Sequence, residues 1–309
     1  MAKPKRKRVN ISAVCPTYNS SSYISRTLAS LVEQVDAPDE VIFCDDGSND
    51  DTTLILEQWK PLFLERGIDV FINKNDHQGP GAARNCGVKH ARYSWIAFLD
   101  SDDIWWQDRL KVLFDFIKKH NNYDVICTNE LWINKMNNKK NNKTIASKYG
   151  PYKNNFYEIL LKYGNCLSTS ASVVKKKYLI DNKIFFSEEK DFTPYEDYDF
   201  WMRIAKNNGK FKFLNEVLGE HLFHKESWGE KNRSILKKST LSILKHHVFN
   251  VQNFTNRKKN LWSHIECGLI LNDITGLLFS KKYFKGFVEL FKLFCRYPIK
   301  LITHILFRL

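Results

Sequence analysis

The side chains in this 309-residue chain that are best suited to chemistry are carboxylates, and they occur in three tight groups. The groups are Asp45-Asp46, Asp100-Ser101-Asp102-Asp103 and Glu196-Asp197-Tyr198-Asp199. Carboxylates held close together raise each other's pKa unless a cation or hydrogen-bond donors lie between them. Mg²⁺ takes oxygen ligands, commonly one or two carboxylates together with substrate phosphates, and a further carboxylate can act as a general base. The three groups therefore indicate metal-assisted chemistry in which a proton is removed.

Two of these groups follow apolar runs that are typical of β-strands. Such runs alternate with amphipathic helical segments through the first half of the chain, which indicates βαβ units and a mainly parallel sheet. The predicted strands are 10–15, 40–44, 68–72, 95–99, 125–132, 168–174 and 211–218, and the predicted helices begin near 20, 51, 79, 107 and 195. Ligands of such sheets bind beyond the carboxyl ends of the strands, where Asp45 and Asp100 are expected. Taken singly, each acidic group also fits a solvated turn or a helix N-terminus.

A glycine turn, Gly79-Pro80-Gly81, precedes Arg84 at the start of a predicted helix. Backbone N–H groups and an arginine in this position can bind an anion. The turn has neither the dinucleotide-binding nor the phosphate-loop spacing. By itself it indicates no more than a tight turn beside a surface arginine.

Charge is divided unevenly along the chain. Residues 1–130 contain 16 Lys and Arg against 19 Asp and Glu, residues 131–309 contain 32 against 15, and the net charge is +14. A nucleic-acid-binding protein usually spreads positive charge over its recognition surface. An excess of Lys and Arg confined to residues 131–309 instead favours anionic lipid or a phosphate-bearing ligand as the partner. With 43% hydrophobic residues the chain can form a core, which excludes wholesale disorder.

The chain shows no strong targeting signal. No stretch approaches the ~18 consecutive apolar residues of a membrane-spanning helix. The basic start, residues 1–8, is followed by an apolar run that is too short for a secretory signal. Seven cysteines without a C-x-x-C pair predict neither a disulfide framework nor a zinc site. We therefore expect a reduced, cytoplasmic protein.

Residues 281–309 contain seven Lys and Arg against one acid, in two predicted amphipathic helices. The apolar faces carry Phe284, Phe287, Val288, Phe291, Phe294 and Cys295, then Ile302, Ile305, Leu306 and Leu309. The opposite faces carry Lys285, Glu289, Lys292 and Arg296, then Lys300, His304 and Arg308. This pattern is typical of interfacial helices on anionic lipid, where each basic residue contributes about 1 kcal/mol. Packing against the rest of the chain or a second subunit is the alternative.

Taken in order, the motifs resemble those of glycosyltransferase family 2, a large bacterial family with the GT-A fold. The matching segments are 16–19 (PTYN), 45–48 (DDGS) with 50–52 (DDT), 81–85 (GAARN), 98–103 (FLDSDD) and 196–201 (EDYDFW). The resemblance covers residues 9–224. It implies an α/β, GT-A type nucleotide-binding, mainly parallel sheet flanked by helices, with a C-terminal helical extension. The expected division is a basic tail (1–8), a GT-A domain (9–230, with donor half 9–133 and acceptor half 134–230) and a helical extension (231–309).

The resemblance implies inverting, metal-dependent transfer of a sugar from a nucleoside-diphosphate sugar, with UDP favoured, to a hydroxyl of a glycan acceptor. The expected acceptor is a lipid-linked oligosaccharide or surface-polysaccharide precursor, shaped by 134–147 and the stretch after 150. The expected cofactor is Mg²⁺ or Mn²⁺, and the expected location is the inner face of the cell membrane, with an anionic membrane surface and no nucleic acid as partner. The alternatives are a nucleotidyltransferase acting on a sugar phosphate and a non-enzymatic protein that binds anionic lipid or nucleic acid.

The resemblance also assigns residues to the donor. The expected donor-binding residues are Pro16, Thr17, Tyr18, Asp46, Arg84, Asp100 and Ser101. Within this set, Thr17 and Tyr18 are expected against the nucleobase, and Asp46 at the edge of the base. Arg84 is expected near the nucleotide, and Asp100 near the ribose and the metal.

The remaining assignments concern the metal and the base. Asp102 and His224 are the expected metal ligands, with Asp103 a weaker candidate, and Asp197 matches the family's catalytic base. The sequence reads His221-Leu222-Phe223-His224 where many members have Tyr-Arg-x-His. Which histidine faces the site is therefore open.

Overall fold

The computed structural model describes residues 9–134, 144–147, 149–152, 155–224, 233–251 and 257–308. The predicted basic tail (1–8), nearly all of the predicted polar segment 134–143 and Leu309 lie outside the described residues. The chain divides into two compact units, one of residues 1–151 with 167–240, the other of residues 152–166 with 241–309.

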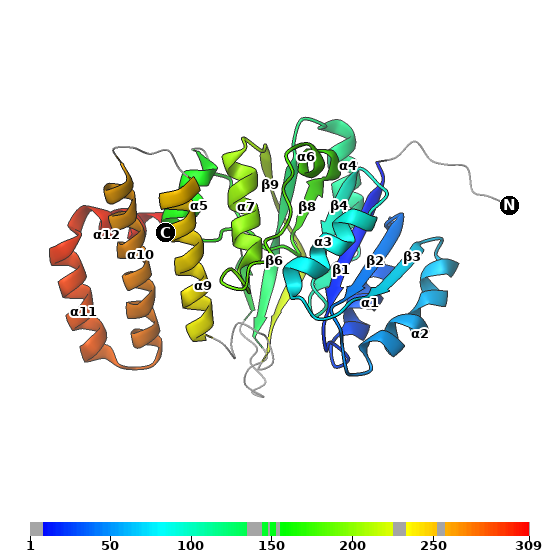
Figure 1. Ribbon diagram of the computed structural model, residues 1–309, viewed down its shortest axis with the longest axis horizontal. Helices are drawn as coiled ribbons and strands as arrows, with labels where there is room; N and C mark the ends of the chain where they lie inside the picture. Colours follow the sequence, from blue (N-terminus) through cyan, green and yellow to red (C-terminus); the bar gives the residue numbers. More distant parts are fainter. Residues whose placement is uncertain are drawn as a thin grey trace. The chain divides into compact units, whose positions relative to one another are not determined.

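The first unit is built on one mixed sheet (Figure 1). Its described strands are β1 (Ile11–Thr17), β2 (Glu40–Asp45), β3 (Asp69–Lys74), β4 (Trp95–Phe98), β5 (Ile104–Trp105), β6 (Val125–Asn134), β7 (Thr144–Ser147), β8 (Ser172–Lys175) and β9 (Phe211–Phe223). Their order is β3-β2-β1-β4-β8-β6-β9-β5, with β7 beside β6. β3, β2, β1 and β4 are mutually parallel, as are β6 and β9, and β8 is antiparallel to both β4 and β6. The predicted α/β sheet is therefore confirmed, and its parallel part carries the first two acidic groups.

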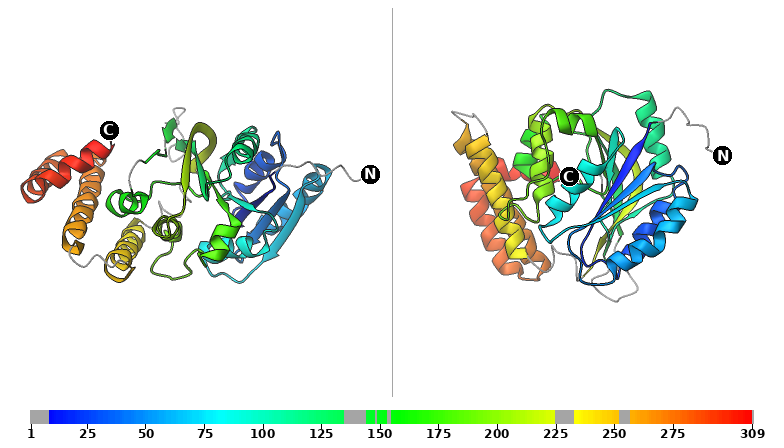
Figure 2. Two further views of the ribbon diagram at one scale, coloured as in Figure 1. Left: turned by 90° about the horizontal axis from the view of Figure 1, so that it is seen from above. Right: turned by 45° about the vertical axis from the view of Figure 1, so that its right-hand side comes forward.

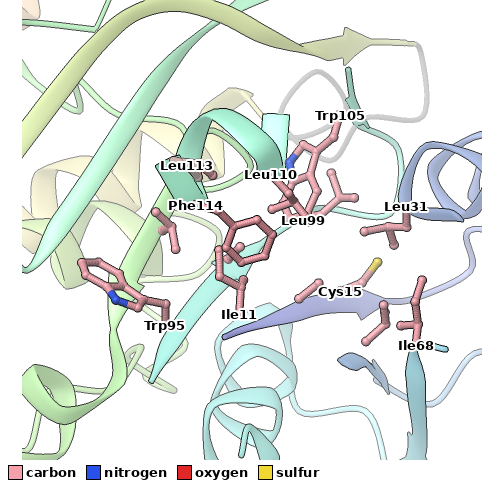
Figure 3. Close-up of a cluster of buried hydrophobic side chains, with 14 of the residues drawn as sticks. Ile11, Cys15, Leu31, Ile68, Trp95, Leu99, Trp105, Leu110, Leu113 and Phe114 are labelled. Carbon is pink, nitrogen blue, oxygen red and sulfur yellow. The ribbon is translucent and has the colours of Figure 1, made fainter. Parts of the chain in front are cut away.

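Helices cover both faces of this sheet (Figure 2). One face packs against α1 (Ile24–Val32), α2 (Thr52–Glu65) and α4 (Arg109–Lys119). The other packs against α3 (Pro80–His90) and α7 (Glu196–Lys206), and a short helix α6 (Lys176–Asp181) follows β8. Because side chains alternate along a strand, Ala13 and Cys15 join the first face, whereas Val14 meets α3. Figure 3 shows the core of the first face around Cys15, Leu31 and Phe114.

The second unit is helical. It contains α5 (Phe156–Tyr163), a π-helical segment (His246–Val251), α10 (Lys258–Phe279), α11 (Tyr283–Arg296) and α12 (Pro298–Arg308), and α9 (Arg233–Lys245) runs across the boundary between the units. Its core contains Cys267, Leu271, Ile274, Leu293 and Leu301. Throughout the ranges that the structure describes, every helix is too short or too polar to cross a membrane.

Candidate functional site

The first two acidic groups lie at one edge of the sheet. Asp45 is the last residue of β2, and the Asp46 N–H donates to the carbonyl of Thr17 at the end of β1 (2.8 Å). The Leu99 N–H donates to Val14 (2.9 Å), so the chain enters Asp100 beside the same strand end. This is the carboxyl edge of the parallel strands, where open α/β sheets bind their ligands.

Asp46 fixes the start of α3. Its buried carboxylate accepts the backbone N–H groups of Gln78 (2.8 Å) and Gly79 (2.9 Å), and the Nδ1 atom of His77 lies 2.7 Å away. Gly79 has φ +103°, a conformation that side-chain-bearing residues rarely adopt. A Cβ atom at Gly81 would overlap the Ser187 carbonyl oxygen, so the first turn of α3 requires glycine for this close approach.

Arg84, on α3, joins the second and third acidic groups. Its buried guanidinium lies 2.6 Å from Asp100 Oδ1 and 2.5 Å from Glu196 Oε1. Burial opposes the charge of Arg84, but these two carboxylates outweigh burial and raise its pKa. Burial also raises the pKa of Glu196, to about 7, against the opposing pull of Arg84. The charged side chain of Arg84 therefore lies between the carboxylate of Asp100, which follows β4, and that of Glu196, which begins α7.

Asp102 and Asp103 have different surroundings. Asp103 is buried and accepts hydrogen bonds from Ser170 Oγ (2.5 Å) and the Leu222 N–H (3.0 Å), with His221 Nδ1 3.1 Å away. Asp102 is partly exposed, and its Oδ2 lies 3.0 Å from Nε2 of His224. Asp103 therefore anchors the end of β9, whereas His224, rather than His221, faces Asp102.

His221 is the charged partner of Asp103. Burial alone would lower the pKa of His221, but the Asp103 carboxylate outweighs burial and raises it to about 10. His224 instead stacks on Tyr23 with ring centroids 4.0 Å apart, which fixes its imidazole beside Asp102.

Asp197 differs from its acidic neighbours in the first turn of α7. Glu196 is buried against Arg84, and Asp199 is buried against Arg203 at 2.7 Å. Asp197 is half-buried, accepts the Tyr198 N–H on Oδ1 (2.7 Å) and has Oδ2 3.4 Å from Thr169 Oγ1. Among the acids of this fully described helix turn, Asp197 is the one that a solvent-borne substrate can reach.

The other predicted donor residues lie at the same edge. Pro16 and Thr17 are buried at the end of β1, and the Thr17 hydroxyl donates to Asp45 Oδ1 (2.9 Å). Tyr18, which follows them, is 44% exposed. The Ser101 hydroxyl pairs with that of Ser20 at 2.6 Å. Tyr18 is therefore the member of the 16–19 motif with an accessible ring.

The Asp102–His224 pair suits the predicted metal. A carboxylate oxygen and an imidazole nitrogen, both at the carboxyl edge, are ligands that Mn²⁺ accepts, and Mg²⁺ uses carboxylates with substrate phosphates. The described residues contain no group of three or more His, Cys, Asp or Glu arranged to hold a metal. A metal bound here would therefore take further ligands from water and substrate.

The sequence profile of glycosyl transferase family 2 matches residues 12–179, more than half of the chain. An Escherichia coli relative, UDP-Glc:alpha-D-GlcNAc-diphosphoundecaprenol beta-1,3-glucosyltransferase WfgD, is 32% identical over 205 residues, which cover 64% of this chain and 70% of that protein. Three other curated relatives are longer, and the chain spans 19% or less of each.

The solved structures with a similar fold include two that hold a sugar nucleotide. TarS 1–349 of Staphylococcus aureus, in complex with UDP-GlcNAc, has a TM-score of 0.56 and 22% identity, covering 85% of this chain and 81% of that chain. The mannosyltransferase PcManGT from Pyrobaculum calidifontis, in complex with GDP-Man and Mn²⁺, has a TM-score of 0.60 and 17% identity, covering 87% and 72%. The likeness confirms the predicted GT-A type fold.

Proposed function

This chain belongs to glycosyl transferase family 2 and is a glycosyltransferase, and from that premise we propose that it transfers a hexose from a UDP-sugar to a lipid-linked glycan. The observation that carries the proposal is the pair of contacts made by Arg84, one with Asp100 and one with Glu196. Glu196 directly precedes Asp197, the proposed general base. The donor is supported by UDP-Glc in the name of the E. coli relative and by UDP-GlcNAc in the S. aureus structure. The acceptor is supported by the diphosphoundecaprenol-linked substrate in the name of the E. coli relative.

Asp197 is the proposed general base. As the acceptor hydroxyl attacks the anomeric carbon, its proton passes to the half-buried carboxylate of Asp197. Attack from the face opposite the diphosphate inverts the anomeric configuration. The neighbouring Glu196 is held by Arg84, which fixes the first turn of α7 against the edge that carries Asp100.

Negative charge develops on the diphosphate as it leaves. Arg84 is permanently charged and orients Asp100 at this edge. Asp102 and His224 would hold Mg²⁺ or Mn²⁺, which when bound supplies positive charge that stabilises the leaving diphosphate. Among the described residues, no contact in the site favours the two alternatives from the sequence, a nucleotidyltransferase and a non-enzymatic lipid or nucleic-acid binder.

A screen of nucleoside diphosphates tests the donor. We expect UDP to raise the melting temperature more than GDP, CDP or TDP, and Mn²⁺ to enlarge the UDP shift. A ligand at 100 times its Kd stabilises the folded state by about 2.7 kcal/mol, which is easily measured. No shift with any nucleotide would contradict the proposal, and a larger shift with GDP would contradict the UDP assignment.

We also propose that the second unit binds an anionic membrane surface at the inner face of the cell membrane. On α11, Gly286 and Leu293 are buried and Leu293 belongs to the core of the unit, whereas Phe284 is 84% exposed and Phe287 and Phe291 are also exposed. On α12, Leu301 is buried and Ile299, Ile302 and Leu306 are exposed. Exposed apolar side chains gathered on two helices mark an interaction site, and the basic residues on the polar faces of these helices suit anionic headgroups. The membrane-binding face is defined here as these six exposed residues.

His304 differs from its predicted place on the polar face of the last helix. It is 1% exposed, its Nε2 lies 3.0 Å from the carbonyl oxygen of His264, and its ring packs against that of His264. The hydrogen bond and ring contact allow this polar side chain to be buried within the second unit. The charged side of α12 is therefore narrower than predicted, and the membrane proposal depends on the remaining lysines and arginines.

Vesicle binding tests the membrane proposal. We expect the protein to sediment with anionic vesicles and not with neutral ones, and added salt to release it, because screening weakens each basic contact. The double variant Phe287→Ser, Phe291→Ser should bind at least about 100-fold more weakly, since burying each ring contributes roughly 1.5–3 kcal/mol. Leu54→Ser with Leu64→Ser, two exposed residues on α2, is the matched control. Binding that is indifferent to lipid charge and to the phenylalanines would contradict the proposal.

A further inference from the structure

Two flat rings stack at the proposed base-binding position. The imidazole of His77 lies against the phenol of Tyr18, with ring centroids 4.3 Å apart and planes 20° apart. The same imidazole places Nδ1 2.7 Å from Asp46 Oδ2. His77 follows β3 in the loop before α3, and its side chain is 57% exposed.

We infer that His77 occupies the nucleobase position in the free protein and that the donor nucleotide must displace it. The inference rests on the proposed function, in which Tyr18 and Asp46 contact the base. A uracil ring offers the same two features as His77, a flat face for Tyr18 and a ring N–H for a carboxylate. Both rings cannot use these groups together.

Among the partners of the Asp46 carboxylate, the His77 side chain is the one that the nucleotide can displace. The other two donors to this carboxylate are the backbone N–H groups of Gln78 and Gly79, which are fixed by the start of α3. The His77 side chain is largely exposed, so it can rotate into water. The rotation gives up its stacking on Tyr18 and its Nδ1 contacts with Asp46, at Oδ2 (2.7 Å) and at the carbonyl oxygen (3.2 Å). Asp46 then keeps its two backbone donors and gains the ring N–H of the base.

This arrangement selects among bases by chemistry. Uracil, thymine and guanine carry a ring N–H that can replace the imidazole donor, whereas cytosine carries a ring nitrogen acceptor at the equivalent position. A cytosine nucleotide would set a lone pair against the Asp46 carboxylate. The preferred donor class is therefore a nucleotide whose base bears a ring N–H.

Displacement has a measurable cost. The apparent Kd of a ligand rises by the inverse of the fraction of protein in the binding-competent state. If the stacked arrangement predominates in the free protein, removing the His77 ring should tighten UDP binding by roughly 3- to 10-fold. This gain in UDP affinity should be smaller when Tyr18 is also removed, because the imidazole then loses its stacking partner and keeps only its contact with Asp46.

Titration calorimetry with UDP tests the inference on the full chain. We expect His77→Ala to lower the Kd for UDP, with less effect in a Tyr18→Ala background, and CDP to bind weakly to both proteins. The control is His120→Ala, which removes another exposed histidine, one that follows α4 and whose ring lies 4.6 Å from that of Phe116. An unchanged or higher Kd in His77→Ala would overturn the inference while leaving the proposed function intact. No UDP binding by any variant would overturn both.

Discussion

Replacing Asp197 by Asn is expected to lower kcat by about 10²–10⁴-fold while leaving the Kd for the donor nucleotide unchanged. The amide keeps the shape of the carboxylate and the contact with the Tyr198 N–H, but it cannot take a proton from the acceptor hydroxyl. Steady-state transfer of radiolabelled sugar to a lipid-linked acceptor measures kcat. Titration calorimetry with UDP measures the Kd for the nucleotide.

A nearby exposed acid provides the control for this variant. Asp191 is exposed and pairs with Lys238 at 3.4 Å, so Asp191→Asn removes a carboxylate from the same region without touching the site. We expect wild-type turnover from it. Turnover near the wild-type rate in Asp197→Asn would remove Asp197 from the mechanism, and a parallel loss of UDP binding would indicate a structural role instead.

Replacing Asp102 by Asn is expected to lower transfer by roughly 10²–10³-fold, the loss typical when one group that stabilises developing charge is removed. The variant should also lose Mn²⁺-enhanced UDP binding, because Asp102 and His224 are the proposed ligands. Excess chelator should abolish transfer by the unmodified protein, and added Mn²⁺ or Mg²⁺ should restore it.

Variants of two other acids distinguish a role of Asp102 in metal binding from a general effect of losing a negative charge. Asp108→Asn removes an exposed carboxylate before α4 and should leave activity unchanged. Asp103→Asn leaves His221 and the Leu222 N–H without their carboxylate, so it should lower the melting temperature. Full activity in excess chelator would contradict the role given to Asp102.

The sequence is sufficient for the parts of the fold that depend on local pattern. Apolar runs such as 95–99 have the length of a buried strand and are bounded by polar residues, so the acids directly after them are expected at a strand end. The predicted strand bounds at 40–44 and 95–99 differ from β2 and β4 by one residue. The predictions do not include β5 or α5, and β5 contains only two residues, too few to show a pattern.

The contacts that assemble the site cannot be derived from local pattern. Asp102 and His224 are 122 residues apart, and Arg84 and Glu196 are 112 apart. These pairs meet because β9 runs parallel to β6 and antiparallel to β5, and because α3 packs beside α7. Family motifs pointed to Arg84 and His224, but no motif signalled that Arg84 holds Glu196 or that His77 stacks on Tyr18.

The most direct test of the site is a crystal structure of the protein with UDP and Mn²⁺, using the anomalous signal of manganese to locate the ion. We predict one manganese peak within coordination distance of Asp102 and His224, with the diphosphate beside it and the uracil on Tyr18. Manganese or nucleotide bound away from these residues would contradict the claim that the three acidic groups form one donor site.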